Sequence, residues 1–146
     1  MFKLGIIGAG WIADKMAATL AHAEDYCIHA IASRSFEKAE AFAQKWGISK
    51  AYGSYEDLVK DENIDLVYVA TPHSHHYEHA LLAIRNNKPV LVEKAFTANA
   101  QEAEQLINEA RSRNVFIAEA IWTRYMPLSK KVKEIMDSGI IGIPRI

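Results

Sequence analysis

A short apolar strand followed at once by a glycine-rich turn is the feature that most constrains the fold. The stretch Leu4-Gly5-Ile6-Ile7-Gly8-Ala9-Gly10-Trp11-Ile12-Ala13 has the spacing G-x-G-x-x-A. In a strand–turn–helix unit of this kind, Gly8 would allow a tight turn and Gly10 would let the backbone approach a pyrophosphate. The N–H groups of Trp11 and Ile12 would face that anion at the positive end of the helix dipole. Small residues are common in turns, so a plain strand-to-helix turn is the alternative.

Segments of strand type and helix type alternate along the rest of the chain. The predicted strands are Lys3 to Ile7, Tyr26 to Ala32, Ile64 to Ala70, Pro89 to Val92 and Val115 to Ala120. The predicted helices run from about Ile12 to Ala23, from the cap Ser35 to Trp46, from Ser54 to Lys60, through Tyr77 to Ile84, from the cap Asn99 through Ala110, and from Pro127 to Gly139. Such alternation with short connections predicts an α/β fold, a doubly wound parallel sheet of the Rossmann type.

Composition limits the partners that the chain can have. The net charge of -1 gives no electrostatic reason to expect nucleic acid or an anionic membrane. The one cysteine, Cys27, fits a reducing compartment. Because the chain also shows neither a secretory leader nor an apolar run of the roughly 20 residues that span a bilayer, we expect a cytoplasmic protein.

The last part of the chain has the pattern expected for the start of a second domain. We expect residues 1–125 to form a dinucleotide-binding domain. Residues 126–146 would be a helix that buries Leu128, Val132 and Ile135, followed by a turn and strand from Ile140 to Ile146. An apolar strand without a following partner suggests a C-terminal substrate domain cut from a longer protein; a frayed tail is the alternative.

The end of the second predicted strand bears on the choice of cofactor. A domain that prefers NAD places Asp or Glu about 20 residues beyond the glycine turn, where it accepts a hydrogen bond from the ribose 2′-hydroxyl. The residues here are Ser33-Arg34-Ser35, without a carboxylate. An arginine with flanking hydroxyls would pair with a 2′-phosphate, which favours NADP over NAD. A solvated arginine at a strand end is the alternative.

Four histidines follow the strand that ends at Ala70. They are His73, His75, His76 and His79, in a segment that begins Thr71-Pro72. Only His79 shares a helix face with His75 or with His76, and neither Asp nor Cys completes a ligand set. We therefore predict no metal site here.

The pair Glu93-Lys94 follows the next predicted strand, at the edge where ligands bind in open α/β sheets. A lysine at that edge can protonate or polarise a carbonyl oxygen while hydride moves to or from the adjacent carbon. Partial burial beside a cationic nicotinamide would lower the pKa of such a lysine. Most lysines are simply solvated, so the spacing alone supports this role weakly.

Taken in order, three of these segments resemble a known family. The glycine turn, the Ala-Thr-Pro-x-x-x-His segment that ends at His76, and the run Lys88-Pro-Val-Leu-Val-Glu-Lys94 are similar to the N-terminal domain of the glucose–fructose oxidoreductase / inositol dehydrogenase (Gfo/Idh/MocA) family. The similarity covers essentially the whole chain. The stretch Glu119-Ala-Ile-Trp-Thr-Arg-Tyr-Met-Pro127 resembles, more narrowly, the dimeric dihydrodiol dehydrogenase branch, whose members use NADP on cyclic diols and sugars.

The resemblance implies a role for each matching residue. The pyrophosphate would lie at Gly8, Gly10, Trp11 and Ile12, and the 2′-phosphate at Ser33 and Arg34. The remaining positions are the cleft residues Thr71, Pro72 and His76, the nicotinamide-ribose contact Glu93, the catalytic Lys94, and Trp122 and Arg124 at the border of nicotinamide and substrate.

Two departures from the family pattern bear on these roles. The family usually follows its Glu-Lys pair with proline, which stiffens the backbone, whereas this chain has Ala95. Lys94 would then be held less firmly or differently. In the family, a second domain supplies most of the substrate pocket, further catalytic groups and the oligomer interface, and this chain stops where that domain would begin.

These observations lead to one hypothesis and two alternatives. The hypothesis is an NADP-dependent oxidoreductase, present as its cofactor domain, whose homo-oligomeric parent acts on a sugar, polyol or cyclic diol. A non-catalytic nucleotide-binding or redox-sensing module would keep the cleft without a substrate domain. A doubly wound domain without a dinucleotide is the third possibility.

Overall fold

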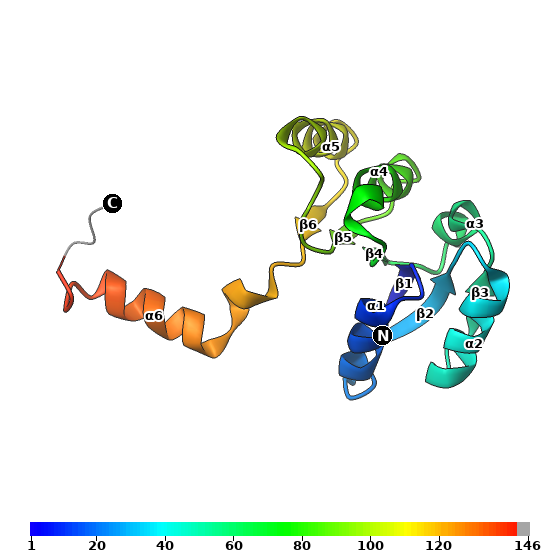
Figure 1. The fold of residues 1–146 in the computed structure, drawn as a ribbon, viewed down its shortest axis with the longest axis horizontal. Coiled ribbons are helices and arrows are strands. Elements are labelled where there is room, and N and C mark those ends of the chain that lie inside the picture. Colours follow the sequence, from blue (N-terminus) through cyan, green and yellow to red (C-terminus); the bar gives the residue numbers. More distant parts are fainter. Residues whose placement is uncertain (143–146) are drawn as a thin grey trace.

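Strand and helix alternate in the structure as the sequence predicts (Figure 1). The computed structural model describes residues 1–142. The strands are β1 (Phe2–Ile7), β2 (Tyr26–Ala32), β3 (Lys50–Tyr52), β4 (Leu66–Val69), β5 (Val90–Val92) and β6 (Ile117–Glu119). The helices are α1 (Trp11–Leu20), α2 (Phe36–Trp46), α3 (Tyr55–Lys60), α4 (His76–Arg85), α5 (Ala100–Ser112) and α6 (Pro127–Asp137), with short 3-10 helices η1 (His73–His75) and η2 (Trp122–Tyr125).

The strands form one parallel sheet in the order β3-β2-β1-β4-β5-β6. The chain first builds outward from β1 through β2 to β3, and then returns to place β4 on the other side of β1. The strand order therefore reverses between β1 and β4, which is the point where open α/β sheets bind ligands. The doubly wound parallel sheet predicted from the sequence is confirmed.

Helices cover the sheet as two separate apolar layers. On one face, α1 and α2 contribute Ala13, Ala17, Ala39, Phe42 and Ala43 to a buried cluster with strand residues such as Ile6 and Ile31. On the other face, α3, α4 and α5 contribute Leu58, Val59, Ala80, Ala83, Ile84, Leu106 and Ala110. Alanine recurs where helices lie on strands because a small side chain permits close packing. Ala13, the last residue of the G-x-G-x-x-A pattern, is fully buried at such a contact.

Side-chain caps set the start of three helices where the sequence predicts them. The Ser35, Ser54 and Asn99 side chains accept hydrogen bonds from the N–H groups of Lys38, Asp57 and Glu102, respectively. Gly47 ends α2 in the left-handed conformation, with φ of 65°. The short strand β3, which the sequence analysis does not predict, lies between α2 and α3.

A buried carboxylate fastens β3 to its surroundings. Asp61 Oδ2 accepts hydrogen bonds from Lys50 Nζ at 2.8 Å and Tyr52 OH at 3.0 Å, and it lies 3.1 Å from His29 Nε2. Burial by itself would raise the pKa of this carboxyl, but the hydrogen bonds outweigh it and hold the pKa far below its usual range. Since the Tyr52 carbonyl in turn accepts from the Ser33 N–H, this cluster supports the turn that follows β2.

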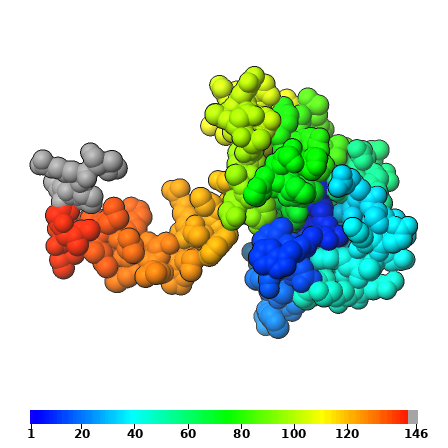
Figure 2. Space-filling model, in the orientation of Figure 1, coloured from blue at the N-terminus to red at the C-terminus, as the bar shows by residue number. Residues whose placement is uncertain are grey.

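Helix α6 corrects one expectation. Its predicted core residues Leu128, Val132 and Ile135 are 69%, 48% and 39% exposed. The helix projects away from the sheet and its covering helices (Figure 1), and in the space-filling view it stands clear of the body of the molecule (Figure 2). Among the described residues, α6 contacts the short helix η2 at its start, and its apolar face remains exposed. Residues 138–141 form a turn after α6, and residues 143–146 of the predicted turn and strand lie outside the described residues.

Candidate functional site

The carboxyl ends of the strands bring five separate segments to one edge of the sheet. They are the glycine turn after β1, the turn Ser33–Ser35 after β2, the segment from Thr71 after β4, the pair Glu93–Lys94 after β5, and the segment from Ala120 after β6. The predicted site residues belong to these five segments or, as His76 and Ile12 do, to the helices that follow them. Parallel pairing thus gathers residues that are more than 100 positions apart.

The glycine turn has the properties of an anion cradle. Gly8 has φ of 103°, and a Cβ on it would lie 2.9 Å from the carbonyl oxygen of Ala70, so this position requires glycine. Gly10 is extended, and a Cβ there would have open space around it. No side chain of the described residues caps α1, which leaves the N–H groups of Trp11 and Ile12 free to bind an anion. These residues fit the pyrophosphate of a dinucleotide.

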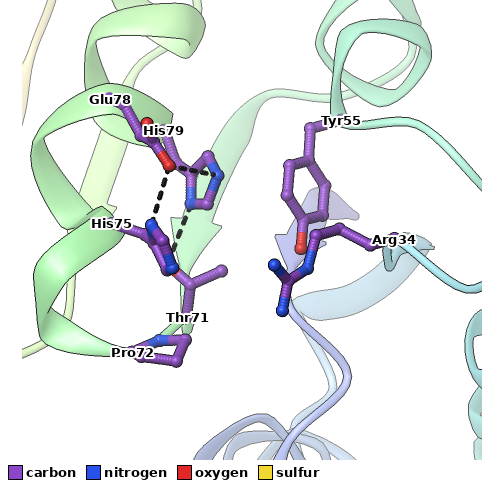
Figure 3. A pocket seen from close by; sticks show the side chains of 7 residues that line it. All are labelled: Arg34, Tyr55, Thr71, Pro72, His75, Glu78 and His79. Carbon is purple, nitrogen blue, oxygen red and sulfur yellow. Dashed lines mark hydrogen bonds and ion pairs between the residues drawn. The ribbon is translucent and has the colours of Figure 1, made fainter.

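The turn after β2 holds Arg34 at the same edge. The N–H of Ser33 donates to the Tyr52 carbonyl at 3.1 Å, and Ser35 caps α2, so the backbone on either side of Arg34 is fixed. The Arg34 side chain is exposed and lines a pocket with Tyr55 from the start of α3. Figure 3 shows these two side chains facing residues of the segment after β4, of η1 and of α4 across the pocket.

The opposite wall of that pocket consists of Thr71, Pro72, His75, Glu78 and His79. The His79 ring packs edge-on against Tyr55, with 4.6 Å between ring centroids, and its Nδ1 lies 3.0 Å from Thr71 Oγ1. Burial lowers the pKa of the His79 imidazole, and the attraction of Glu78 offsets this only in part. Burial therefore favours the neutral form of the His79 imidazole.

His76 differs from its histidine neighbours because it is completely buried. Its Nδ1 lies 2.7 Å from the carbonyl oxygen of Ala95 and its Nε2 lies 2.8 Å from that of Thr71. The ring joins the segment after β4 to the segment after β5. The sequence predicted that His76 lines the cleft. The structure instead buries the ring, which contacts the backbone of two segments that end at the cleft.

Glu93 and Lys94 lie at the end of β5 in different environments. The Glu93 carboxylate is buried, and it accepts hydrogen bonds from the Tyr68 hydroxyl and from the Lys94 N–H. Burial raises the pKa of the Tyr68 hydroxyl, and its contact with Glu93 raises it further, so Tyr68 is a fixed donor. The Lys94 side chain is exposed, and the Lys94–Ala95 peptide bond is cis. The partial burial expected for Lys94 is not provided by the described residues.

The segment after β6 adds an apolar hollow beside Glu93. Trp122 lines this hollow, together with Met16 of α1, Leu91 of β5 and Ala118 of β6. Trp122 is 58% exposed, and Arg124 is exposed two residues further along η2. The fold therefore places Trp122 near Glu93, and apolar surface remains open to solvent around it.

Three contributors to the site escape the sequence analysis. Tyr55 lines the pocket beside Arg34, Glu78 lines its opposite wall, and the Tyr68 hydroxyl donates a hydrogen bond to Glu93. The spacing of His75 and Glu78, three residues apart at the start of a helix, was the available signal for Glu78. Tyr68 gave no such signal, because in the sequence it is one more residue of a buried strand.

Two further findings concern metals and membranes. Among residues 1–142, no three His, Cys, Asp or Glu side chains are arranged to hold a metal ion. Over the same residues, no helix combines the length and the apolar character needed to cross a bilayer.

Comparison with known proteins places these features in context. The family model described as the oxidoreductase family with an NAD-binding Rossmann fold, GFO_IDH_MocA, matches residues 2–120. Mouse trans-1,2-dihydrobenzene-1,2-diol dehydrogenase is 41% identical over 99% of this chain and 44% of its own length. D-xylose 1-dehydrogenase (NADP(+)) of Hypocrea jecorina is 45% identical over 96% of this chain and 39% of its own length.

A solved structure agrees with the fold. KijD10, a 3-ketoreductase from Actinomadura kijaniata determined in complex with TDP-benzene and NADP, superposes with a TM-score of 0.88 and 31% identity. The superposition covers 97% of this chain and 45% of KijD10. The chain therefore spans less than half the length of each of these relatives.

Proposed function

The chain belongs to the Gfo/Idh/MocA family of oxidoreductases with an NAD-binding Rossmann fold, and from this premise we propose that it is the NADP-binding domain of a dehydrogenase or reductase. Hydride would pass between the nicotinamide and a secondary alcohol or carbonyl group of a sugar, polyol or cyclic diol. The names of the two enzymes compared above, one acting on a cyclic diol and one on a sugar, support this substrate class.

The observation that carries the choice of NADP is the position of Arg34. It follows β2 at the edge that holds the glycine turn, and the turn Ser33–Ser35 has no carboxylate to repel a 2′-phosphate. A guanidinium with neighbouring hydroxyl groups suits a phosphate. The NADP in the name of the fungal xylose dehydrogenase and in the KijD10 complex supports the same choice.

Each part of the edge would then contact a different part of the cofactor. Gly8, Gly10, Trp11 and Ile12 would hold the pyrophosphate. Ser33 and Arg34 would bind the 2′-phosphate, Thr71 and Pro72 would line the adenosine side, and Glu93 would face the nicotinamide ribose. Trp122 and Arg124 would border the nicotinamide and the substrate, and His76 would keep the segments after β4 and β5 together through its two carbonyl contacts.

Lys94 would be the residue that handles the proton. A bound NADP(H) supplies or accepts the hydride, and the oxygen of the reacting carbon then has to gain or lose a proton. Lys94 follows Glu93 at the edge, and its exposed amine is free to reach a substrate oxygen. Burial of this amine would have to come from substrate and from groups outside the described residues.

We also propose that residues 1–125 form the cofactor domain and that residues from 126 onward begin a second, substrate-binding domain. The exposed apolar side chains of α6 and the apolar hollow beside Trp122 support this division, because both are surfaces that a second domain would cover. The homo-oligomeric state and the cytoplasmic location expected from the sequence belong to the same proposal.

Replacing Arg34 with Asp tests the cofactor assignment. The substitution removes a charge-assisted contact and puts a repelling carboxylate in its place, so NADPH affinity should fall on the order of tenfold to a hundredfold. NADH affinity should change little. The measurement is fluorescence titration of the unchanged chain and of the Arg34→Asp variant, each with NADPH and with NADH. Equal losses for the two cofactors would overturn the assignment, and no binding of either by the unchanged chain would overturn the proposed function.

Replacing Lys94 with Ala tests the catalytic role, in a protein that carries a second domain. Turnover should fall by about a hundredfold to ten-thousandfold, the range for loss of a general acid or base, while NADPH affinity stays nearly the same. Steady-state kinetics with a polyol or sugar substrate and NADPH titration give the two readouts. Undiminished turnover would show that another group moves the proton.

A further inference from the structure

A carboxylate shares the pocket of Arg34, although the turn Ser33–Ser35 after β2 has none. Glu78, in the first turn of α4, lines this pocket from the wall opposite Arg34 (Figure 3). Its side chain is 61% exposed, so it keeps most of its contact with solvent. The crevice that would hold the adenosine end of a dinucleotide therefore has a cation on one wall and an anion on the other.

The nearest partners of Glu78 are two histidines. Its Oε1 lies 2.9 Å from His75 Nδ1 and 3.4 Å from His79 Nε2. An ionised carboxylate only accepts hydrogen bonds, so the nitrogen of each ring that faces it carries the proton. In neutral His79, the other nitrogen then accepts from the Thr71 hydroxyl. Because burial favours the neutral His79 ring, this ring positions Glu78 through a contact that leaves the carboxylate charge in place.

Two further charged residues of opposite sign lie near Glu78. On its far side, Glu78 also lines a neighbouring hollow, together with Glu56 of α3 and Arg85 of α4. The Arg85 Nε lies 3.5 Å from a carboxylate oxygen of Glu109, so its charge is already paired. Among the residues that line the pocket, Arg34 is the one with a permanent positive charge.

From this arrangement we propose that Glu78 sets the balance between adenosine ligands that carry a 2′-phosphate and those that carry a 2′-hydroxyl. The proposal rests on the proposed function, because it assumes that Arg34 binds the 2′ position. A carboxylate repels a phosphate and accepts a hydrogen bond from a ribose hydroxyl. Glu78 thus supplies from α4 the carboxylate that the end of β2 lacks, and it limits the preference that Arg34 creates.

The test replaces Glu78 with Gln, which keeps the size and the acceptor oxygen of the side chain and removes its charge. Affinities are measured by calorimetry for adenosine 2′,5′-bisphosphate and for adenosine 5′-monophosphate, which differ only at the 2′ position. The ratio of the two affinities should shift toward the bisphosphate on the order of threefold to tenfold, as expected for one exposed, partly screened charge. Glu104→Gln on the exposed side of α5 is the matched control and should leave the ratio unchanged.

Three outcomes are distinct. A shift in the Glu78 variant alone supports the proposal. Binding of both ligands with an unchanged ratio overturns it and leaves the proposed function standing. If neither ligand binds the unchanged chain at millimolar concentration, the adenosine site itself is wrong, and the proposed function fails with it.

Discussion

Helices α5 and α6 have similar apolar patterns, but the apolar face is buried in α5 and exposed in α6. In α5, Leu106 and Ala110 are buried against the sheet. In α6, Leu128, Val132 and Ile135 fall at helical spacing on one face and are all exposed. A periodic pattern identifies the face of a helix that is suited to burial. It does not identify what covers that face.

Chain connectivity explains the difference. Because α5 joins β5 to the parallel strand β6, both of its ends are fixed at the sheet and the helix has to lie across it. Within the described residues, α6 is fixed at its start, where Ser129 Oγ donates to the Thr123 carbonyl of η2. A helix held at one end can extend away from the sheet, and its apolar face then stays exposed.

The largest loss of stability in this comparison is expected for a substitution of Leu106. Replacing it with Ala removes a fully buried side chain from the layer between α5 and the sheet. The free energy of unfolding should fall on the order of 2 to 5 kcal/mol, because the loss of buried surface and the resulting cavity both cost stability. Urea denaturation followed by circular dichroism measures the change. A loss below 1 kcal/mol would mean that the layer is loosely packed in solution.

The smallest loss of stability is expected for a substitution of Leu128, which is the matched position in α6. Replacing it with Ala changes a side chain that is 69% exposed, so the unfolding free energy should stay within about 0.5 kcal/mol. The same denaturation experiment applies. A loss comparable to that at Leu106 would show that α6 packs against the rest of the chain in solution, and the contrast between the two helices would disappear.

The fold was largely predictable from local signals. The predicted strand Tyr26–Ala32 and the helix bounded by Ser35 and Gly47 coincide with β2 and α2 because strand composition, a cap and a left-handed glycine agree there. Lys50–Tyr52 escaped prediction because three residues are too few to show a strand period. Helix α1 ends at Leu20, short of the predicted Ala23, since no residue there gives a sharp stop signal.

The site was predictable only in part. The glycine turn, Arg34 and Glu93–Lys94 each follow a strand, and strand ends in a parallel sheet meet at one edge, so their common location follows from the topology. Contacts across elements do not follow from it. His76 was expected at the cleft surface and is instead buried between two carbonyl groups. Glu78 faces Arg34 only because α4 and the end of β2 flank the same crevice.

The measurement that tests the central claim most directly is NADPH titration of Gly10→Val. A side chain at Gly10 meets open space and an extended backbone, so the fold should tolerate it. The same side chain would occupy the region in front of the α1 N–H groups, and NADPH affinity should fall about tenfold or more. Ala21→Val, at the exposed far end of α1, is the matched control and should bind normally. Unchanged NADPH affinity in a folded Gly10 variant would contradict the claim that this turn holds the cofactor.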